Sequence, residues 1–245
     1  KSGIIKKNCP VVTIKQQPGV EQILRKKAEE LHADYHIAPA IAESKIKDGR
    51  LTFIYPGLGE VKLSMTGSYQ TENAALAIRT LQILGKRGYF VTKMQILKGV
   101  EKAKWSGRFE CLSKNPLFYI DGAHNTAAAE ELSASLMQHF PTLKRIGITG
   151  VVADKPYREM IHILEPEFET IYTVTPDNKR SLSAEKLAEE WRRQGVGAIA
   201  KEGVQDAVKA AYDEAEADGE AAVVIAFGSL YYLKEVKCAL YEIKK

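Results

Sequence analysis

From residue 107 to the C-terminus, short apolar strands alternate with amphipathic helices, and this pattern constrains the fold more than any other feature of the sequence. The expected strands are 117–120, 146–149, 170–174, 198–200 and 222–227, and the expected helices are 127–140, 157–164, 184–193, 204–217 and 230–243. Such alternation predicts an α/β fold in which helices cover both faces of a mostly parallel sheet. A segment of about 140 residues is large enough for a Rossmann-like domain of about six strands.

The residues before this segment differ in pattern and in charge. Three expected helices (20–31, 71–84 and 91–103) accompany a hairpin formed by 51–55 and 61–65. The net charge is +9 over residues 1–105 and −5 over residues 106–245. Because a charge step of this size predicts a domain boundary, we expect one domain at 1–105 and a second at 106–245. The basic first part suits an anion such as a nucleotide, or is a solvated surface of ordinary composition.

Composition argues against several classes of protein. The longest apolar stretch, 221–227, is far shorter than the ~20 residues that span a bilayer. Cys9, Cys111 and Cys238 lack the CxxC spacing of a zinc ribbon, and three cysteines do not make a disulfide framework. The basic residues are dispersed, which argues against nucleic acid. We therefore expect a soluble, cytoplasmic protein that binds neither nucleic acid nor membrane. Because the chain begins with Lys1 instead of Met, we also expect it to be a piece of a longer protein.

Four polar clusters follow expected strands of the second domain, where open α/β sheets bind ligands. The first is Asp121-Gly122-Ala123-His124-Asn125, in which Asn125 is a credible N-cap and Gly122 permits a tight turn. Five such residues at a strand end favour a ligand role for Asp121 and His124. The other clusters are 150–156, 175–181 and 228–229. A capped loop explains 150–156 equally well, and by default Ser229 is an N-cap.

Two further candidates precede these clusters. Arg108 lies at the expected domain boundary, where its planar guanidinium suits a phosphate or carboxylate across a cleft. Taken alone, it also fits a surface salt bridge. Asn73 stands at the start of an expected helix and either hydrogen-bonds a base edge or caps that helix together with Gln70. No Walker A, GxGxxG, HExxH or GxSxG motif occurs. The residues alone thus indicate an anion-binding α/β domain joined to part of another domain.

Five motifs in a fixed order carry a more specific signal. They are GSYQTENAALAI at 67–78, WSGRFE at 105–110, DGAHN at 121–125, GVVADK at 150–155 and GSLYYL at 228–233. In this combination the chain resembles the ATP-dependent Mur ligase superfamily, and within it the folylpolyglutamate synthase/dihydrofolate synthase family. The resemblance covers essentially the whole chain, as the rear part of a central ATPase domain followed by a complete C-terminal Rossmann-like domain.

The resemblance implies a reaction and a set of site residues. Members of the family phosphorylate the γ-carboxylate of a folate with Mg²⁺ and ATP, and L-glutamate then attacks the acyl phosphate to form an amide. By carry-over of matching positions, Asn73 contacts the adenine, Arg108 the phosphates and Asp121 the ribose. His124 and Ser229 lie near the incoming glutamate, with Arg108 and His124 as the catalytic residues. Lys1 corresponds to a lysine whose carbamylated form faces a magnesium ion.

The resemblance also sets expectations for partners and activity. The partners are folate, L-glutamate and ATP, and we expect a monomer. Because the P-loop of the family has no counterpart in these residues, we expect the chain alone to be inactive. Three alternatives stay open: a non-catalytic binding module of the same fold, a related ligase that acts on a cell-wall precursor, and a nucleotide-dependent dehydrogenase, which the missing GxGxxG disfavours.

Overall fold

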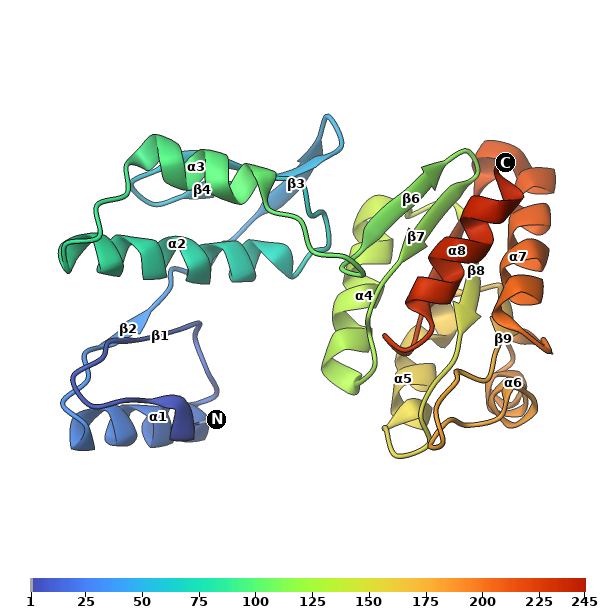
Figure 1. Ribbon diagram of the computed structural model, residues 1–245, viewed down its shortest axis with the longest axis horizontal. Coiled ribbons are helices and arrows are strands. Elements are labelled where there is room, and N and C mark those ends of the chain that lie inside the picture. The colour runs from blue at the N-terminus through green and yellow to red at the C-terminus, as the bar shows by residue number, and fades with distance from the viewer. Residues whose placement is uncertain (1) are drawn as a thin grey trace. The chain divides into compact units, whose positions relative to one another are not determined.

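The computed structural model describes residues 2–245, apart from the side chain of Glu220, and these residues form two compact units. The first unit ends at Lys104 and the second begins at Trp105. Figure 1 shows the order of the elements within each unit. None of the described helices combines the length and the apolar composition that a membrane span requires.

The first unit contains two small sheets. A parallel pair, β1 and β2, packs with α1, and an antiparallel sheet in the order β3-β4-β5 packs with α2 and α3. Its elements are β1 (Val11–Thr13), α1 (Pro18–Glu30), β2 (Tyr35–Ile37), β3 (Ser44–Lys47), β4 (Arg50–Tyr55), β5 (Gly59–Leu63), α2 (Gln70–Lys86) and α3 (Lys93–Lys102), after a 3-10 turn at Ser2–Ile4. The expected hairpin is confirmed as β4 and β5. Buried and exposed residues alternate at the end of β5, whereas β4 is buried at Leu51, Thr52, Phe53 and Tyr55.

The second unit is a six-stranded sheet in the order β10-β9-β8-β11-β7-β6, in which only β6 runs antiparallel to its neighbour. This confirms the expected α/β fold with a mostly parallel sheet. Its elements are β6 (Glu110–Lys114), β7 (Leu117–Ile120), α4 (Thr126–His139), β8 (Lys144–Thr149), α5 (Tyr157–Leu164), β9 (Thr170–Thr173), α6 (Ala184–Arg193), β10 (Gly197–Ala200), α7 (Val204–Asp218), β11 (Ala222–Phe227) and α8 (Leu233–Ile243), with 3-10 turns at Glu165–Glu167 and Gly219–Ala221.

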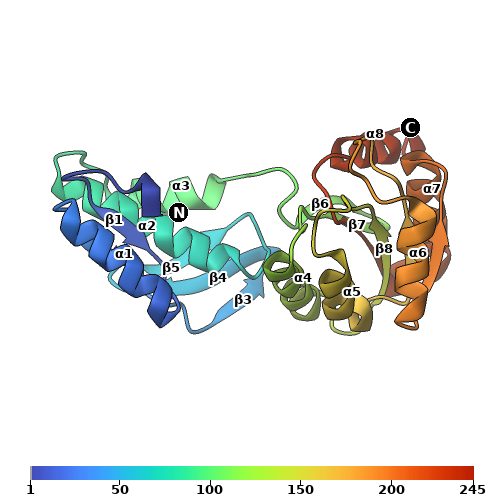
Figure 2. The ribbon, with the colours of Figure 1, turned by 90° about the horizontal axis from the view of Figure 1, so that it is seen from below.

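Helices cover both faces of this sheet and produce two hydrophobic cores. The core between the sheet and α4, α5 and α6 includes Val223, Ile225 and Phe227 of β11, whereas Val224 and Ala226 of β11 face α7 and α8. Figure 2 shows α4 and α5 on one side of the sheet and α8 on the other. Every residue of β11 is buried. A central strand with two buried faces leaves chemistry only at its ends.

Three strands escaped prediction because they are short or polar. β6 is a half-exposed edge strand with the sequence ECLSK, and its register shifts between Cys111 and Ser113. β2 and β3 have three and four residues, so neither gives a clear alternation. The expected helix at 230–243 is also shorter, because α8 begins only at Leu233.

A carboxylate on α7 fastens that helix to the sheet. Glu214 accepts hydrogen bonds from the Tyr172 hydroxyl (2.8 Å) and the Thr170 hydroxyl (3.0 Å) of β9. It also pairs with the Lys144 ammonium of β8 at 2.8 Å, and Lys144 pairs in turn with Asp218 at 2.8 Å. Burial raises the pKa of Glu214, but these hydrogen bonds outweigh burial and hold the pKa below its usual range.

This arrangement predicts a pH-dependent contribution to stability. Because the pKa of Glu214 is lowered in the folded state, its stabilising effect is complete above the ordinary carboxyl range and is lost as pH falls toward the folded-state pKa. We expect Glu214→Gln to lower the free energy of unfolding at pH 7 by roughly 1–2 kcal/mol. The difference from wild type should shrink as pH falls from 5 to about 3. Urea denaturation, monitored by the fluorescence of the buried Trp191, measures this difference in the free energy of unfolding.

Glu216→Gln is the matched control, because Glu216 is exposed on the same helix. A loss of stability equal in both variants, or independent of pH, would contradict the proposed role of the Glu214 contacts.

Candidate functional site

Four parallel strands end at one edge of the six-stranded sheet. β7 pairs with β11, β11 with β8, and β8 with β9, all in parallel. The loops that follow these strands therefore emerge on the same side. The four polar clusters expected from the sequence, at 121–125, 150–156, 175–181 and 228–229, lie in these loops. Their shared location is confirmed.

The Asp121 carboxylate connects three segments at this edge. Asp121 is 3% exposed. Its Oδ2 accepts the backbone N–H of Phe109 and its Oδ1 accepts that of Ala123, each at 2.8 Å. The N–H of Asp121 donates to the carbonyl of Ala226 at 2.9 Å. One residue thus joins the turn before β6, the turn after β7 and the end of β11.

The turn that carries Arg108 is set by its neighbours. Gly107 and Phe109 have φ angles of 72° and 46°, both in the left-handed region. The N–H of Gly107 donates to Glu110 at 2.7 Å, and its carbonyl accepts the N–H of Gly122 at 2.8 Å. The ring of Phe109 is buried in the core. Arg108 is therefore held in place through the backbone on both of its sides.

The Arg108 guanidinium has no protein partner. Arg108 is half-buried, and among residues 2–245 its side chain makes no hydrogen bond or ion pair. The surface salt bridge that the sequence allowed as an alternative is thus not formed within the described part of the chain. By contrast the nearby Lys237 is paired with Glu110 at 2.8 Å. An unpaired guanidinium on a fixed turn keeps its donors available for an anion.

A pocket of ≈ 330 Å³ opens at this edge of the sheet. It draws at least one residue from each of the four loops. It is lined by His124, Val152, Lys155, Arg180, Ser229, Leu230 and Tyr231. A site built from four separate loops around a rigid sheet is the usual form of a small-molecule site in an α/β domain.

His124 presents one ring nitrogen as an acceptor. Its Nδ1 lies 2.8 Å from the carbonyl oxygen of Gly122. Because a carbonyl only accepts, Nδ1 carries the proton in this contact, and in the neutral ring Nε2 keeps a lone pair. Asn125, the next residue, caps α4 by accepting the N–H of Ala128 at 3.0 Å, which confirms the expected N-cap. The turn thus fixes the tautomer of the imidazole at the pocket.

Ser229 lies in the pocket wall and does not cap α8. The residue is 3% exposed, and its hydroxyl accepts the N–H of Tyr231 at 3.3 Å. The N-cap of α8 is Tyr232. The default assignment of Ser229 as an N-cap is therefore wrong, because a turn follows Gly228 and α8 begins only at Leu233. Gly228 has a φ of 111°, and a Cβ there would lie 2.7 Å from the carbonyl oxygen of Gly150.

A glycine is needed at position 122 because a side chain would not fit there, and not because its φ angle is unusual. A Cβ at this position would lie 2.6 Å from Leu230 Cδ2 and 3.2 Å from the carbonyl oxygen of Gly107. The sequence predicted that Gly122 permits a tight turn. In the structure, Gly122 allows the turn after β7 to lie close to Leu230 and Gly107.

Lys155 and Arg180 are pocket residues to which the sequence had assigned no role. Each falls in a polar cluster after a parallel strand, and Lys155 also ends the motif GVVADK at 150–155. Their convergence depends on β8 and β9 being neighbours in the sheet. Neighbouring strands are not identifiable from strand order along the chain.

The remaining predicted residues have separate locations. Asn73 is exposed on the first turn of α2, where its Nδ2 donates to Gln70 at 3.2 Å. The cap of that helix is Tyr69 without a side-chain bond, so Asn73 and Gln70 do not cap it. Lys1, the expected metal-facing residue, lies outside the described residues. Asn73 belongs to the first unit, and the pocket residues belong to the second.

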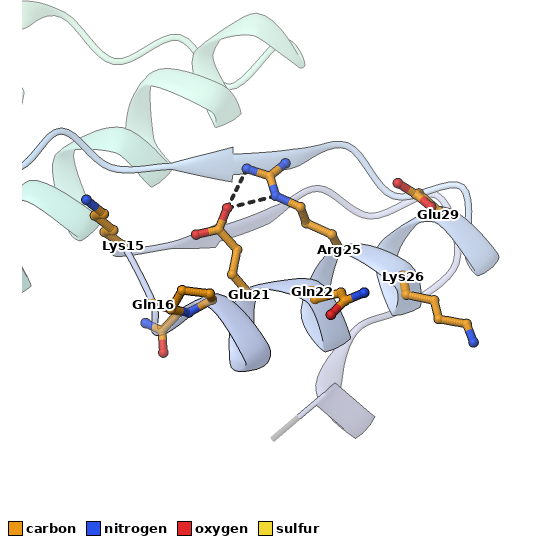
Figure 3. Close-up of a pocket in the computed structure, with 8 residues that line it drawn as sticks. Lys15, Gln16, Glu21, Gln22, Arg25, Lys26 and Glu29 are labelled. Carbon is orange, nitrogen blue, oxygen red and sulfur yellow. Dashed lines mark hydrogen bonds and ion pairs between the residues drawn. The ribbon is translucent and has the colours of Figure 1, made fainter.

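A second pocket, in the first unit, lacks the features of a specific site. Figure 3 shows the side chains that line it spread along α1 and the loop before it, with Arg25 directed at Glu21. Nε and Nη2 of Arg25 both lie 2.8 Å from Glu21 Oε1. The pocket lies on the outside of one helix and mixes both signs of charge, so the edge of the six-stranded sheet is the stronger candidate.

Comparison with known proteins gives a consistent result. A family model described as Mur ligase, glutamate ligase domain, matches residues 107–230. The dihydrofolate synthase/folylpolyglutamate synthase of Bacillus subtilis is 29% identical over 97% of this chain and 56% of its own length. The folylpolyglutamate synthase of Lacticaseibacillus casei is 31% identical over 74% of this chain and 44% of its own length.

A solved structure extends the likeness to the fold. The Mycobacterium tuberculosis folylpolyglutamate synthase complexed with ADP and AMPPCP has a TM-score of 0.84 and 23% identity, over 99% of this chain and 57% of that one. The chain spans about half the length of the relatives it matches. These findings confirm the resemblance that the sequence motifs predicted, which was to the central and C-terminal part of such proteins.

The Asp121 contacts predict a measurable effect on stability. In Asp121→Asn one side-chain oxygen becomes an NH₂ group, which leaves the N–H of Phe109 or of Ala123 without an acceptor in the protein. We expect the free energy of unfolding to fall by roughly 1–3 kcal/mol. Urea denaturation monitored by Trp191 fluorescence measures the change. Asp177→Asn, at an exposed position in the loop after β9, is the control. Equal stability of the two variants would contradict the bridging role of Asp121.

Proposed function

The chain belongs to the Mur ligase family through its glutamate ligase domain, and we propose that it is the central and C-terminal part of a folylpolyglutamate synthase. The proposed enzyme is an ATP-dependent ligase that adds L-glutamate to the γ-carboxylate of a folate. The observation that carries this proposal is the pocket at the sheet edge, which brings His124 and Ser229 together with two cations inside the segment matched by the family.

The proposed reaction has two steps. An oxygen of the folate γ-carboxylate attacks the γ-phosphorus of ATP, which forms an acyl phosphate and releases ADP. The amino nitrogen of glutamate then attacks the acyl carbon, the C–O bond to phosphate breaks, and inorganic phosphate leaves. The amine is a nucleophile only after it has lost a proton. Such a reaction depends on positioning and on stabilisation of negative charge.

His124 and Ser229 receive roles at the second step. The lone pair on His124 Nε2, left by the Nδ1 contact with Gly122, accepts a proton from the incoming amine. The buried hydroxyl of Ser229 accepts the N–H of Tyr231, so its own proton is free to donate to glutamate. Both residues line the same pocket, which supports a shared ligand.

Arg108, Asp121 and Asn73 receive roles toward ATP. The unpaired Arg108 guanidinium binds the phosphates and stabilises the charge transferred to ADP. Asp121 accepts two backbone N–H groups and so positions the Arg108 turn. Its proposed role toward ATP is at the ribose. The exposed amide of Asn73 hydrogen-bonds the adenine edge.

Magnesium and Lys1 belong to the proposal only as part of the parent enzyme. Among residues 2–245, no group of three His, Cys, Asp or Glu side chains is arranged to hold a metal ion. The described residues do not account for magnesium, and no step above is assigned to it.

The name of one relative also favours a second substrate that accepts glutamate. The Bacillus subtilis relative is named for dihydrofolate synthase as well as folylpolyglutamate synthase activity. We extend the proposal to dihydropteroate as acceptor, because the same attack of a glutamate amine on an acyl phosphate makes dihydrofolate.

The proposal predicts a defined activity and a defined loss. The full-length protein that contains this chain should incorporate labelled glutamate into tetrahydrofolate only in the presence of ATP and magnesium. Arg108→Ala should lower turnover at saturating ATP by about ten- to hundredfold, because a charge-assisted contact contributes roughly 1.5–3 kcal/mol. Lys104→Ala removes an exposed cation that stands four residues earlier in the chain, and it should leave turnover within about twofold. Unchanged turnover in Arg108→Ala would refute the role of Arg108, and no incorporation by wild type would refute the proposed function.

A further inference from the structure

The backbone of Phe109 is unusual within the described part of the chain. The residues other than glycine that have a positive φ there are Asn8, His32, Asp48 and Phe109. The first three are exposed, and Asn, His and Asp are the residue types found most often in this left-handed region. Phe109, with a φ of 46°, is bulky and only 2% exposed. For such a residue the left-handed conformation is strained, and it persists only where the surrounding contacts hold it.

An aromatic cluster surrounds the ring of Phe109. Its centroid lies 4.9 Å from that of His139, 5.1 Å from that of Tyr119 and 6.1 Å from that of Phe140. Tyr119 and Phe140 also meet edge to face at 5.1 Å. Tyr119 belongs to β7, and the other two residues stand at the C-terminal end of α4. Because such ring pairs attract one another beyond the area that they bury, the cluster opposes any rotation of Phe109 out of the left-handed region.

A buried ion pair holds the backbone of Phe140. The carbonyl of Phe140 accepts hydrogen bonds from Nη2 of Arg145 at 2.7 Å and from its Nε at 3.2 Å. Arg145 also pairs with Glu167, which accepts the hydroxyl of Ser133 on α4 at 2.6 Å. Arg145 and Glu167 are 7% and 8% exposed, and no step of the proposed reaction uses them. Because its backbone is held in this way, Phe140 gives the Phe109 ring a fixed surface to pack against.

We infer that Tyr119, His139 and Phe140 are positioning residues for Arg108, an inference that rests on the proposed function. They act through Phe109, because their contacts with its ring hold its strained backbone in place. That backbone in turn sets the direction in which the neighbouring Arg108 side chain leaves the chain. When ring contacts are lost, residue 109 relaxes toward negative φ and displaces the guanidinium from the phosphates. Because charge stabilisation depends on exact placement of the donor, such a displacement lowers turnover.

The experiment is a double-mutant cycle in the full-length protein. Turnover is the incorporation of labelled glutamate at saturating ATP, tetrahydrofolate and glutamate. Phe140→Leu keeps an apolar side chain but removes the ring contacts, and it should lower kcat by roughly three- to tenfold when Arg108 is present. In the Arg108→Ala background the same substitution should change kcat by less than about twofold, because no guanidinium remains to be displaced.

Phe168→Leu is the matched control. Phe168 belongs to the same hydrophobic core and is 5% exposed, against 6% for Phe140, but its ring stacks on Phe227 at 5.1 Å instead of on Phe109. Its effect on kcat should be the same within about twofold whether or not Arg108 is present. The control thus separates a general loss of core packing from a displacement of Arg108.

Tyr119 provides a second pair of variants, which serves if Phe140→Leu does not fold, because Tyr119 is only half-buried. Tyr119→Phe keeps the ring and should keep kcat within about twofold, whereas Tyr119→Leu should lower kcat as Phe140→Leu does. If Phe140→Leu and Tyr119→Leu change kcat by the same factor with and without Arg108, or do not change it at all, the inference is overturned and the proposed function stays intact. A wild type that incorporates no glutamate would overturn both.

Discussion

The contacts of a single buried carboxylate determine how the candidate site is assembled. Asp121 accepts the N–H groups of Phe109 and Ala123 at 2.8 Å each, and its own N–H reaches the end of β11. A buried carboxylate is stable only when hydrogen bonds replace its lost water. The two backbone donors meet that requirement, and in doing so they hold the turn of Arg108 beside the turn of His124. A backbone hydrogen bond from Gly122 to the carbonyl of Gly107 joins the same two turns at 2.8 Å.

In the six-stranded sheet, the residues that pack the core are different from those that line the candidate site. β11 is buried along its whole length between two helical layers, so its side chains serve packing alone. Polar groups gather where β7, β8, β9 and β11 end, and there glycines allow backbones to approach closely. Gly228 and Gly122 leave no room for a Cβ against Gly150 and Leu230, respectively. These close backbone approaches allow the four loops after the strands to line one pocket.

Local chemistry and periodic patterns were predictable from the sequence, whereas convergence in space was not. β11 is an apolar run because both of its faces are buried, and Asn125 caps α4 through a contact three residues away. The antiparallel edge strand β6 escaped because half-exposed strands carry no apolar run. Lys155 and Arg180 lie 25 positions apart in the numbering and meet only because β8 and β9 are adjacent. The ordered motifs predicted the family and include Lys155, but they did not show that Lys155 and Arg180 line one pocket.

The central claim is that one pocket, formed by the four strand ends, binds the incoming amino acid. The most direct measurement is a titration of ¹⁵N-labelled chain with L-glutamate, followed residue by residue through backbone amide chemical shifts. The amide shifts around His124, Lys155, Arg180 and Ser229 should change with glutamate concentration until they saturate. L-Lysine should not cause the same changes. Shifts confined to the α1 pocket of the first unit (Figure 3), with none at the strand ends, would contradict the claim.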